Sequence, residues 1–374
     1  MTRSPDALVV GAGVVGLTTA ISLAEAGLRT HILAAAPPQQ STSFVAGAIW
    51  GPVRTGGSAR SLEWSRVGLE VLSELAAEPR AAIRQVSGVE VAATAATPPG
   101  WISLLPQHRL LEPGELPDGY ASGWRYTAPV VTMPRYLPYL VDRLTAAGGT
   151  VEYGAPLTSL RPLAVPVKDG PVKDGPLKDG PVKDVPLIVN CTGIGARDLV
   201  PDPAVTPVRG QVVIVENPGI EEFFRHPSDG PESTYIFPHG DVVLLGGTAE
   251  EGAWDLTPDP ATTTRILRDC CAVEPRLSGS RIVAERVGLR PYRPQVRLEA
   301  EDLSEGRVLW HNYGHGGAGV TLAWGCAREL TETVVSLAGA TARSGGRERS
   351  PGRASSCSSG AGSRCRRPAC RPAR

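Results

Sequence analysis

The sequence predicts an α/β protein in which a Rossmann-like nucleotide-binding unit is interleaved with an antiparallel β-sheet. An apolar strand over residues 7–10 runs into the motif Gly11-Ala-Gly13-Val-Val-Gly16, and an apolar helix follows. Thr30-His-Ile-Leu33 then supplies the second strand of a βαβ unit. Short strand patterns broken by Pro and Gly occur over 86–131, and alternating strands recur over 209–246.

The glycine motif predicts a dinucleotide site. Gly11 permits a tight turn, Gly13 lets the backbone approach a pyrophosphate, and Gly16 lets helix and strand pack closely. The helix N-terminus would hold the diphosphate, because its free N–H groups and dipole favour negative charge. A βαβ unit that binds no nucleotide is the alternative. The acid that usually binds the adenosine ribose is absent, since the second strand ends in Leu33-Ala-Ala-Ala-Pro-Pro38.

A second glycine turn lies near the other end of the folded part of the sequence. An apolar strand from Val308 leads into the glycine-rich turn Gly314–Gly319, and a helix continues to about Leu337. Two glycine-rich helix N-termini predict a cofactor that is gripped at both ends. The small-residue loop Ser41–Gly51 and the strand end Val189-Asn-Cys-Thr-Gly193 are further places where the backbone can approach a flat cofactor. A plain connecting loop is the alternative for Ser41–Gly51.

Other elements follow from hydrophobic periodicity and from turn residues. Helices are expected over Ser61–Leu75, with Trp64, Val67 and Leu72 facing inward, over Pro134–Ala147 and over Thr262–Val273. Short strands are expected at Val89–Ala92, Trp101–Leu105, Gly123–Thr127, Thr150–Tyr153, Arg209–Glu216, Thr234–Pro238, Val242–Gly246 and Arg281–Leu289.

Composition excludes several classes of protein. Of the 374 residues, 41% are hydrophobic and 20% charged, which is typical of a globular enzyme. The net charge of zero hides an asymmetry: residues 340–374 carry nine Arg and one Glu, a charge of +8, which leaves −8 for the rest. An acidic body argues against a nucleic-acid partner. No apolar run approaches the roughly 18 residues of a membrane span, so no membrane partner is expected.

Two segments fall outside the predicted core. Residues 167–186 repeat a VKDGP-like unit four times, which predicts a low-complexity surface loop. Residues 340–374 lack an apolar period and are expected to form a disordered basic tail. The seven cysteines have no zinc-ligand spacing, so no metal site is predicted, and a reduced, cytoplasmic chain is expected.

Together these stretches resemble the D-amino-acid oxidase family, which includes the D-aspartate oxidases. The resemblance covers residues 6–338 in family order. Its most specific parts are Gly288-Leu-Arg290-Pro-Tyr-Arg-Pro-Gln-Val-Arg-Leu-Glu299 and His311-Asn-Tyr-Gly-His-Gly-Gly-Ala-Gly319. It also rests on the first glycine motif and on Val45–Trp50, Val189–Gly193 and Arg209–Gln211.

The resemblance implies an FAD flavoprotein that oxidises D-amino acids, with neutral side chains expected. Hydride passes from the α-carbon to the flavin, oxygen reoxidises the flavin with release of hydrogen peroxide, and the imino acid hydrolyses to a 2-oxo acid and ammonia. No catalytic acid or base is implied, so neither His311 nor His315 is assigned a proton. The partners are therefore small molecules, and a homodimer is one option for the assembly.

The same resemblance implies a division into two discontinuous domains. An FAD-binding domain would comprise residues 1–85, 132–205 and 281–338. A substrate domain would comprise residues 86–131 and 206–280.

Three residues match positions that hold the substrate in this family. Arg290 matches the arginine that clamps the carboxylate, a role suited to a bidentate guanidinium. Tyr235 matches a tyrosine whose hydroxyl also touches the carboxylate, and Gly317 matches a glycine whose carbonyl accepts from the amine. A surface ion pair and a core aromatic are the alternatives for Arg290 and Tyr235. Arg293 and Arg297 are interpreted as structural ion pairs.

The residues implied to line the cofactor come from the two glycine turns, the loop after the second strand and the strand end near residue 192. They are Gly11, Ala12, Gly13, Val14, Val15, Gly16, Ser41, Thr42, Ser43, Gly47, Ala48, Ile49, Thr192, Gly193, Arg290, His315, Gly316, Gly317, Ala318, Gly319, Val320 and Thr321.

Departures from the family pattern leave alternatives open. Pro231 and Ala318 stand where many members carry aromatic residues, which predicts a more open active site. A D-aspartate oxidase or a glycine/sarcosine-type amine oxidase is the alternative within the class. Arg225 is the one cation proposed to bind the acidic side chain of D-aspartate. An NAD-dependent dehydrogenase and an impaired FAD-binding homologue are the alternatives outside it.

Overall fold

The computed structural model of the chain describes residues 4–52, 58–154, 157–160, 185–228, 230–303 and 307–345, with side chains up to residue 337. Residues 1–333 form one compact unit and residues 334–374 a second. Nearly all of the predicted repeat loop and residues 346–374 of the predicted tail lie outside the described residues.

Strands of the first unit join in one mixed sheet of 14 described strands. Thirteen follow the order β4-β5-β3-β9-β10-β11-β8-β13-β14-β7-β1-β2-β6, and β12 pairs with β8 beside this path. One end of the sheet is parallel and is built from apolar strands, of which β1, β2 and β7 are buried along their whole length. The parallel strands are β1 (Ala7–Val10), β2 (Thr30–Ala34), β6 (Thr150–Tyr153), β7 (Leu187–Asn190) and β14 (Val308–His315).

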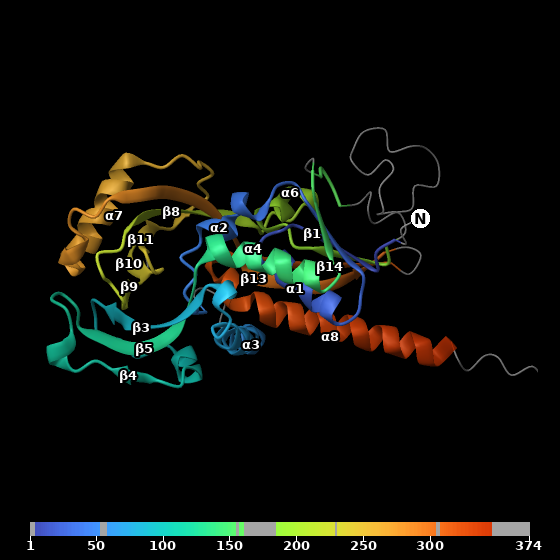
Figure 1. Ribbon diagram of the computed structural model, residues 1–374, viewed down its shortest axis with the longest axis horizontal. Coiled ribbons are helices and arrows are strands. Elements are labelled where there is room, and N and C mark those ends of the chain that lie inside the picture. The colour runs from blue at the N-terminus through green and yellow to red at the C-terminus, as the bar shows by residue number, and fades with distance from the viewer. Residues whose placement is uncertain are drawn as a thin grey trace, which may run out of the picture. The chain divides into compact units, whose positions relative to one another are not determined.

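Helices lie beside this parallel end (Figure 1). α1 follows β1 directly, and α8 follows β14 in the same way. The helices are α1 (Val14–Glu25), α3 (Ala59–Leu75), α4 (Met133–Ala146) and α8 (Gly319–Gly345), with the one-turn helices α2 (Thr42–Val45) and α6 (Ala196–Leu199) and the 3-10 turns η1 (Pro38–Gln40), η2 (Pro79–Ala81), η5 (Gly193–Gly195) and η8 (Gly316–Ala318).

The other end of the sheet is mostly antiparallel, and α7 (Pro260–Val273) packs on it. Ile266 and Cys270 of α7 enter an apolar core with Val213, Val215 and Leu245. The strands are β3 (Ile83–Ala92), β4 (His108–Leu110), β5 (Ser122–Val131), β8 (Thr206–Glu216), β9 (Phe223–His226), β10 (Glu232–Pro238), β11 (Val242–Thr248) and β12 (Glu250–Glu251), with the 3-10 turns η4 (Pro113–Glu115) and η6 (Pro275–Leu277).

One long strand, β13 (Ile282–Asp302), connects the two ends of the sheet. Its first part, to Tyr292, pairs with β8, and its second part, from Tyr292 onward, pairs with β14. The sequence predicted a strand only to Leu289, because Pro291 and Pro294 interrupt the strand pattern. β13 thus belongs to both the parallel and the antiparallel ends, and the predicted two-domain division stays a prediction.

The first glycine motif adopts the geometry that its spacing predicts. Gly11 has φ +110°, and a Cβ there would lie 2.5 Å from the carbonyl oxygen of Cys191. A Cβ on Gly16 would overlap the carbonyl oxygen of Gly11, so α1 can pack this closely on β1 only with glycine at that position.

Two further expectations about secondary structure are wrong. Trp101–Leu105 is not a strand but part of a 3-10 helix, η3 (Gly100–Leu104). Prolines precede this segment, and the N–H of Ile102 turns back to the Pro99 carbonyl at 3.0 Å instead of joining a sheet. α8 continues to Gly345 rather than ending near Leu337, so the first residues of the expected tail are helical; alanines at 338, 340 and 342 favour this extension.

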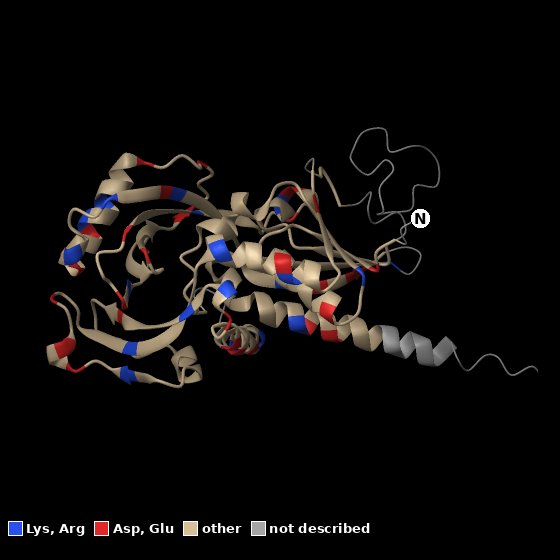
Figure 2. Cartoon of the chain, viewed as in Figure 1, with Lys and Arg blue, Asp and Glu red and all other residues tan. Residues whose placement is uncertain are grey.

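Charged residues of both signs stand side by side along α3 and α7 (Figure 2). On α3, Arg66 pairs with Glu63 at 2.7 Å, and on α7, Arg265 pairs with Asp269 at 3.2 Å. The inward face predicted for α3 is confirmed, because Trp64, Val67 and Leu72 are buried. Within the described ranges, every helix is too short or too polar to cross a membrane.

The turn between β10 and β11 predicts a pH dependence of stability. His239 lies there with Nε2 shielded from solvent, and burial lowers its pKa to about 4. Because the folded pKa lies below the unfolded value of about 6.5, protonation favours unfolding. We expect the contribution of this histidine, at most about 3 kcal/mol, to be complete above about pH 7 and lost between pH 6.5 and 4.

Urea titrations of the wild type and His239→Gln at pH 7.5, 5.5 and 4.5 measure this effect. The variant should lose less unfolding free energy than the wild type over this range. Equal losses in the two proteins would contradict the assignment.

Candidate functional site

A cavity of about 1110 Å³ lies where the C-terminal ends of β1 and β7 meet β8, β10 and β13. Typical small-molecule pockets hold about 300–1,000 Å³, so this cavity is large enough for a dinucleotide and a small substrate. Its wall includes both glycine-rich turns, the loop after β2 and the turn after β7. These four segments are the ones that the sequence predicted to surround a cofactor.

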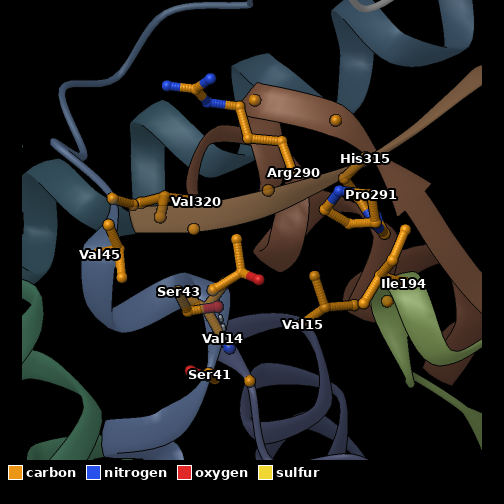
Figure 3. A pocket seen from close by; sticks show the side chains of 18 of the residues that line it. Val14, Val15, Ser41, Ser43, Val45, Ile194, Arg290, Pro291, His315 and Val320 are labelled. Carbon is orange, nitrogen blue, oxygen red and sulfur yellow. Dashed lines mark hydrogen bonds between the residues drawn. The ribbon is translucent and has the colours of Figure 1, made fainter. Parts of the chain in front are cut away.

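At one end of the cavity the first glycine turn meets the loop after β2. The backbone N–H of Val14, in the first turn of α1, donates to Ser43 Oγ at 3.1 Å. Thr42 Oγ1 in turn donates to the carbonyl of Leu289 on β13 at 2.9 Å. Figure 3 shows Ser41 and Ser43 beside Val14 at this end. The loop is therefore tied both to a helix N-terminus suited to phosphate and to β13.

The end of β2 lacks an acidic residue, as its sequence shows, and alanines 34–36 line the cavity there. Asp198, in α6, is the only Asp or Glu among the described lining residues. The sequence pattern gave no indication of Asp198, because no motif marks an acid that follows β7 rather than β2.

The second glycine turn forms another part of the wall. Gly316, Gly317 and Gly319 line the cavity, followed by Val320 and Thr321 at the start of α8. The Thr321 hydroxyl is engaged with the backbone of Gly51, accepting from its N–H and donating to its carbonyl, both at 3.1 Å. Any contact of Thr321 with a ligand must therefore come mainly from its backbone.

Nearly all of the predicted cofactor residues line this one cavity. The two exceptions are Gly16, which packs on the backbone of Gly11, and Ala318, which is buried beneath the turn.

Two histidines of the second glycine turn have different places. His315 lines the cavity next to Pro291 (Figure 3), and its buried Nε2 has no partner among the described residues. Burial lowers the pKa of His315 to about 4, so its ring is neutral near pH 7. His311 is buried away from the cavity lining, with Nε2 3.2 Å from Glu301 Oε2. Neither position offers a protonated acid at neutral pH.

Arg290 reaches toward the end of the cavity that lies away from Val14 and Ser41 (Figure 3). Its Nη1 donates to the carbonyl of Thr248 at 2.8 Å. The guanidinium lies on Gly210, where a Cβ would overlap it. One hydrogen bond and one flat surface thus hold the group in a fixed orientation within the cavity.

Tyr235 approaches Arg290 from β10. Its ring stacks on Phe237, with centroids 4.8 Å apart and planes inclined by 16°. Burial raises the pKa of Tyr235, and the neighbouring charge of Arg290 only partly opposes this, so the hydroxyl keeps its proton. Arg290 and Tyr235, which are 55 positions apart in the sequence, therefore form one cationic, hydrogen-bonding corner of the cavity.

The neighbouring arginines are structural, as the sequence analysis proposed. Arg293 Nε lies 3.0 Å from Asp202 Oδ2. Arg297 donates to the Tyr313 hydroxyl at 2.7 Å and pairs with Glu299 at 2.6 Å. Neither belongs to the described lining of the cavity.

The described residues fit FAD in three respects. Glycines allow close backbone approach at two helix N-termini, as a diphosphate and a flavin edge require. Apolar side chains, Val15, Val45 and Ile194 among them, supply flat contacts for rings (Figure 3). Arg290 supplies positive charge at the far end, where a small anionic substrate would meet the cofactor.

The whole described core matches one protein family. The family model of the FAD dependent oxidoreductases matches residues 6–333. A D-amino-acid oxidase from Rubrobacter xylanophilus is 45% identical over 335 residues, which is 89% of this chain and 96% of that protein. The human D-aspartate oxidase is 34% identical over 345 residues, which is 87% of this chain and 93% of that protein.

Among solved structures, a glycine oxidase from Bacillus cereus aligns with a TM-score of 0.70, covering 89% of this chain and 95% of its own. At 16% identity that likeness shows the fold alone. The match to the family model, the 45% identity and the observed fold agree with one another. The chain therefore belongs to the D-amino-acid oxidase family of FAD-dependent oxidoreductases.

Proposed function

We propose that this enzyme uses FAD to oxidise D-amino acids with uncharged side chains. The overall reaction converts a D-amino acid, oxygen and water into a 2-oxo acid, ammonia and hydrogen peroxide. The observation that carries the proposal is the corner formed by Arg290 and Tyr235 at the end of the cavity away from the first glycine turn. The name of the 45% identical relative supports the same activity.

In this proposal, Arg290 binds the substrate carboxylate. Its guanidinium offers a charge-assisted, two-pronged grip, and the bond to Thr248 fixes the plane of that grip. The Tyr235 hydroxyl donates a further hydrogen bond to the same carboxylate. Because both groups belong to the sheet, they define which face of the α-carbon is presented, and this orientation is the main catalytic contribution of the protein.

The backbone carbonyl of Gly317 accepts from the substrate amine, which sets a second point of attachment. FAD, when bound, would supply the acceptor for the α-hydrogen and its electron pair. The protein therefore needs no base for that hydrogen, which agrees with the neutral His315 in the cavity wall. Arg290 and Gly317, on β13 and at the start of α8, together orient the amino acid.

The first glycine turn would hold the FAD diphosphate. Val15 presents a backbone N–H group at the α1 N-terminus, and Ser43, whose Oγ accepts from the Val14 N–H, can donate its own hydroxyl proton. The backbone around residues 316–321 would meet the polar edge of the flavin.

The alternatives are less well supported. A family model of FAD-dependent oxidoreductases argues against a nicotinamide dehydrogenase. The D-aspartate oxidase is less similar than the D-amino-acid oxidase, and the glycine oxidase shares the fold at low identity. Oxygen as the acceptor, a homodimer and a cytoplasmic location stay predictions; four free cysteines among the described residues support a reducing compartment.

Anaerobic mixing of the purified holoenzyme with amino acids tests the proposal. We expect D-alanine and D-methionine to bleach the flavin absorbance, whereas their L-forms do not. Bleaching by D-aspartate alone would favour the D-aspartate oxidase alternative. A bound flavin that no amino acid reduces would refute the proposed activity.

Arg290→Lys should lower kcat/KM for D-alanine roughly 100-fold, equivalent to about 3 kcal/mol, because lysine cannot grip a carboxylate with two parallel bonds. Stopped-flow flavin reduction measures the effect, with the FAD content determined beside it. The matched control is Arg281→Lys, an exposed surface pair with Glu216 near the start of β13. A loss of less than threefold in Arg290→Lys would contradict the clamp.

Gly210→Ala tests the surface beneath the clamp. The new Cβ would displace the flexible guanidinium rather than the backbone, so stability should change little while KM for D-alanine rises about tenfold. Steady-state kinetics and thermal unfolding measure the two effects. Gly100→Ala, where a Cβ meets open space, is the control. An unchanged KM in a folded Gly210→Ala enzyme would show that this surface does not position Arg290.

A further inference from the structure

A second buried arginine lies in the wall of the cavity. Arg225 on β9 is 8% exposed and, besides Arg290, is the only Lys or Arg among the described lining residues. A Cβ on Gly51 would lie 3.4 Å from its Nη1, so the guanidinium reaches the loop that Thr321 holds. The substrate end of the cavity thus contains two cations, of which the proposed mechanism uses one.

Arg225 belongs to a row of paired residues across three strands. Its register partner on β3 is Glu90, and its register partner on β10 is Tyr235. Directly paired residues project from the same face of a sheet. Glu90, Arg225 and Tyr235 therefore follow one another along a line that ends at the carboxylate-binding corner.

Glu90 holds a negative charge behind Arg225. Glu90 is 4% exposed and lies outside the described lining of the cavity. Glu90 Oε2 is 2.9 Å from Arg225 Nη1 and accepts from the Tyr126 hydroxyl at 3.0 Å. Burial opposes the charge of Arg225, but the neighbouring Glu90 carboxylate keeps the pKa of Arg225 raised, so the guanidinium stays charged.

Arg225 lines the cavity although one of its nitrogens is turned to Glu90. Nη1 is shielded from solvent and makes no aligned hydrogen bond to the described residues. A substrate side chain could therefore meet the part of the Arg225 side chain that lines the cavity. That side chain would not meet a net positive charge, because Glu90 lies close to Arg225 in a poorly solvated site and its negative charge cancels the positive charge of Arg225.

We propose that Glu90 sets the side-chain specificity of the enzyme by cancelling the charge of Arg225, so that neutral polar side chains are accepted and acidic ones are rejected. An acidic side chain must lose its hydration to enter and finds its natural counter-charge already occupied. Glu90 acts here through Arg225 and is a positioning residue. The proposal rests on the proposed D-amino-acid oxidation and adds its side-chain specificity.

The wild-type holoenzyme supplies the first test. D-asparagine and D-aspartate have nearly the same shape and differ in charge, so their ratio of kcat/KM isolates the electrostatic effect. We expect a ratio of roughly 100 in favour of D-asparagine, equivalent to about 3 kcal/mol. Equal values would overturn the proposal. Flavin reduction by neither amino acid, nor by D-alanine, would refute the proposed function itself.

Glu90→Gln supplies the second test, because glutamine keeps the shape and the acceptor for Tyr126 but removes the charge. We expect the D-aspartate to D-asparagine ratio of kcat/KM to rise at least tenfold in the FAD-loaded variant. The double variant Glu90→Gln/Arg225→Gln should lose that gain. Glu222→Gln, which removes an exposed charge paired with Arg125, is the matched control and should leave the ratio at the wild-type value.

The outcomes separate the two proposals. An unchanged ratio in Glu90→Gln, with D-alanine still oxidised, would overturn the role of Glu90 while the proposed function stands. A gain that persists in the double variant would also overturn it, because the gain would not come from Arg225. If Glu90→Gln fails to fold, the wild-type ratio alone decides.

Discussion

The pairing of β13 with both β8 and β14 is the constraint on which the site depends. Its first part belongs to the antiparallel end of the sheet and its second part to the parallel end. Arg290 stands just before the change of partner at Tyr292, so its position is fixed relative to the glycine turns as well as to β10. If Arg290 stood on a loop, its position relative to the glycine turns could vary, whereas a paired strand limits the movement of its side chains.

The electrostatics of the cavity follow from this frame. The cavity wall is positive at three places. Backbone N–H groups provide the charge at two helix N-termini, and the Arg290 guanidinium provides it at one corner. The second arginine, Arg225, is balanced by Glu90. His315 is neutral because burial lowers its pKa to about 4. The cavity therefore offers its net charge at the places proposed to bind diphosphate and carboxylate.

Local patterns predicted the parallel strands, α1 and the roles of Gly11 and Gly16, because each depends on neighbours within a few residues. The meeting of Tyr235 with Arg290 came only from the resemblance to a known family. Glu90 could not be recognised as the partner of Arg225, since strand register across 135 positions has no signal in a single sequence. Asp198 could not be recognised because no motif marks it. The strand predicted at Trp101–Leu105 is wrong, because the prolines before it favour a 3-10 turn. α8 extends beyond its predicted end, because alanines favour continuation of the helix.

The two arginines at the proposed substrate end of the cavity, Arg290 and Arg225, differ in how strongly the sheet fixes their positions. Arg290 stands within a strand of 21 residues, and its guanidinium is anchored on Thr248, whereas Arg225 stands on a strand of four residues and takes its charge balance from β3. In the proposed function, binding of the carboxylate that all amino acids share is therefore separated from selection of the side chain that distinguishes them. If these roles hold, substitutions on β3 and β9 would alter side-chain selection while leaving the carboxylate clamp on β13 in place.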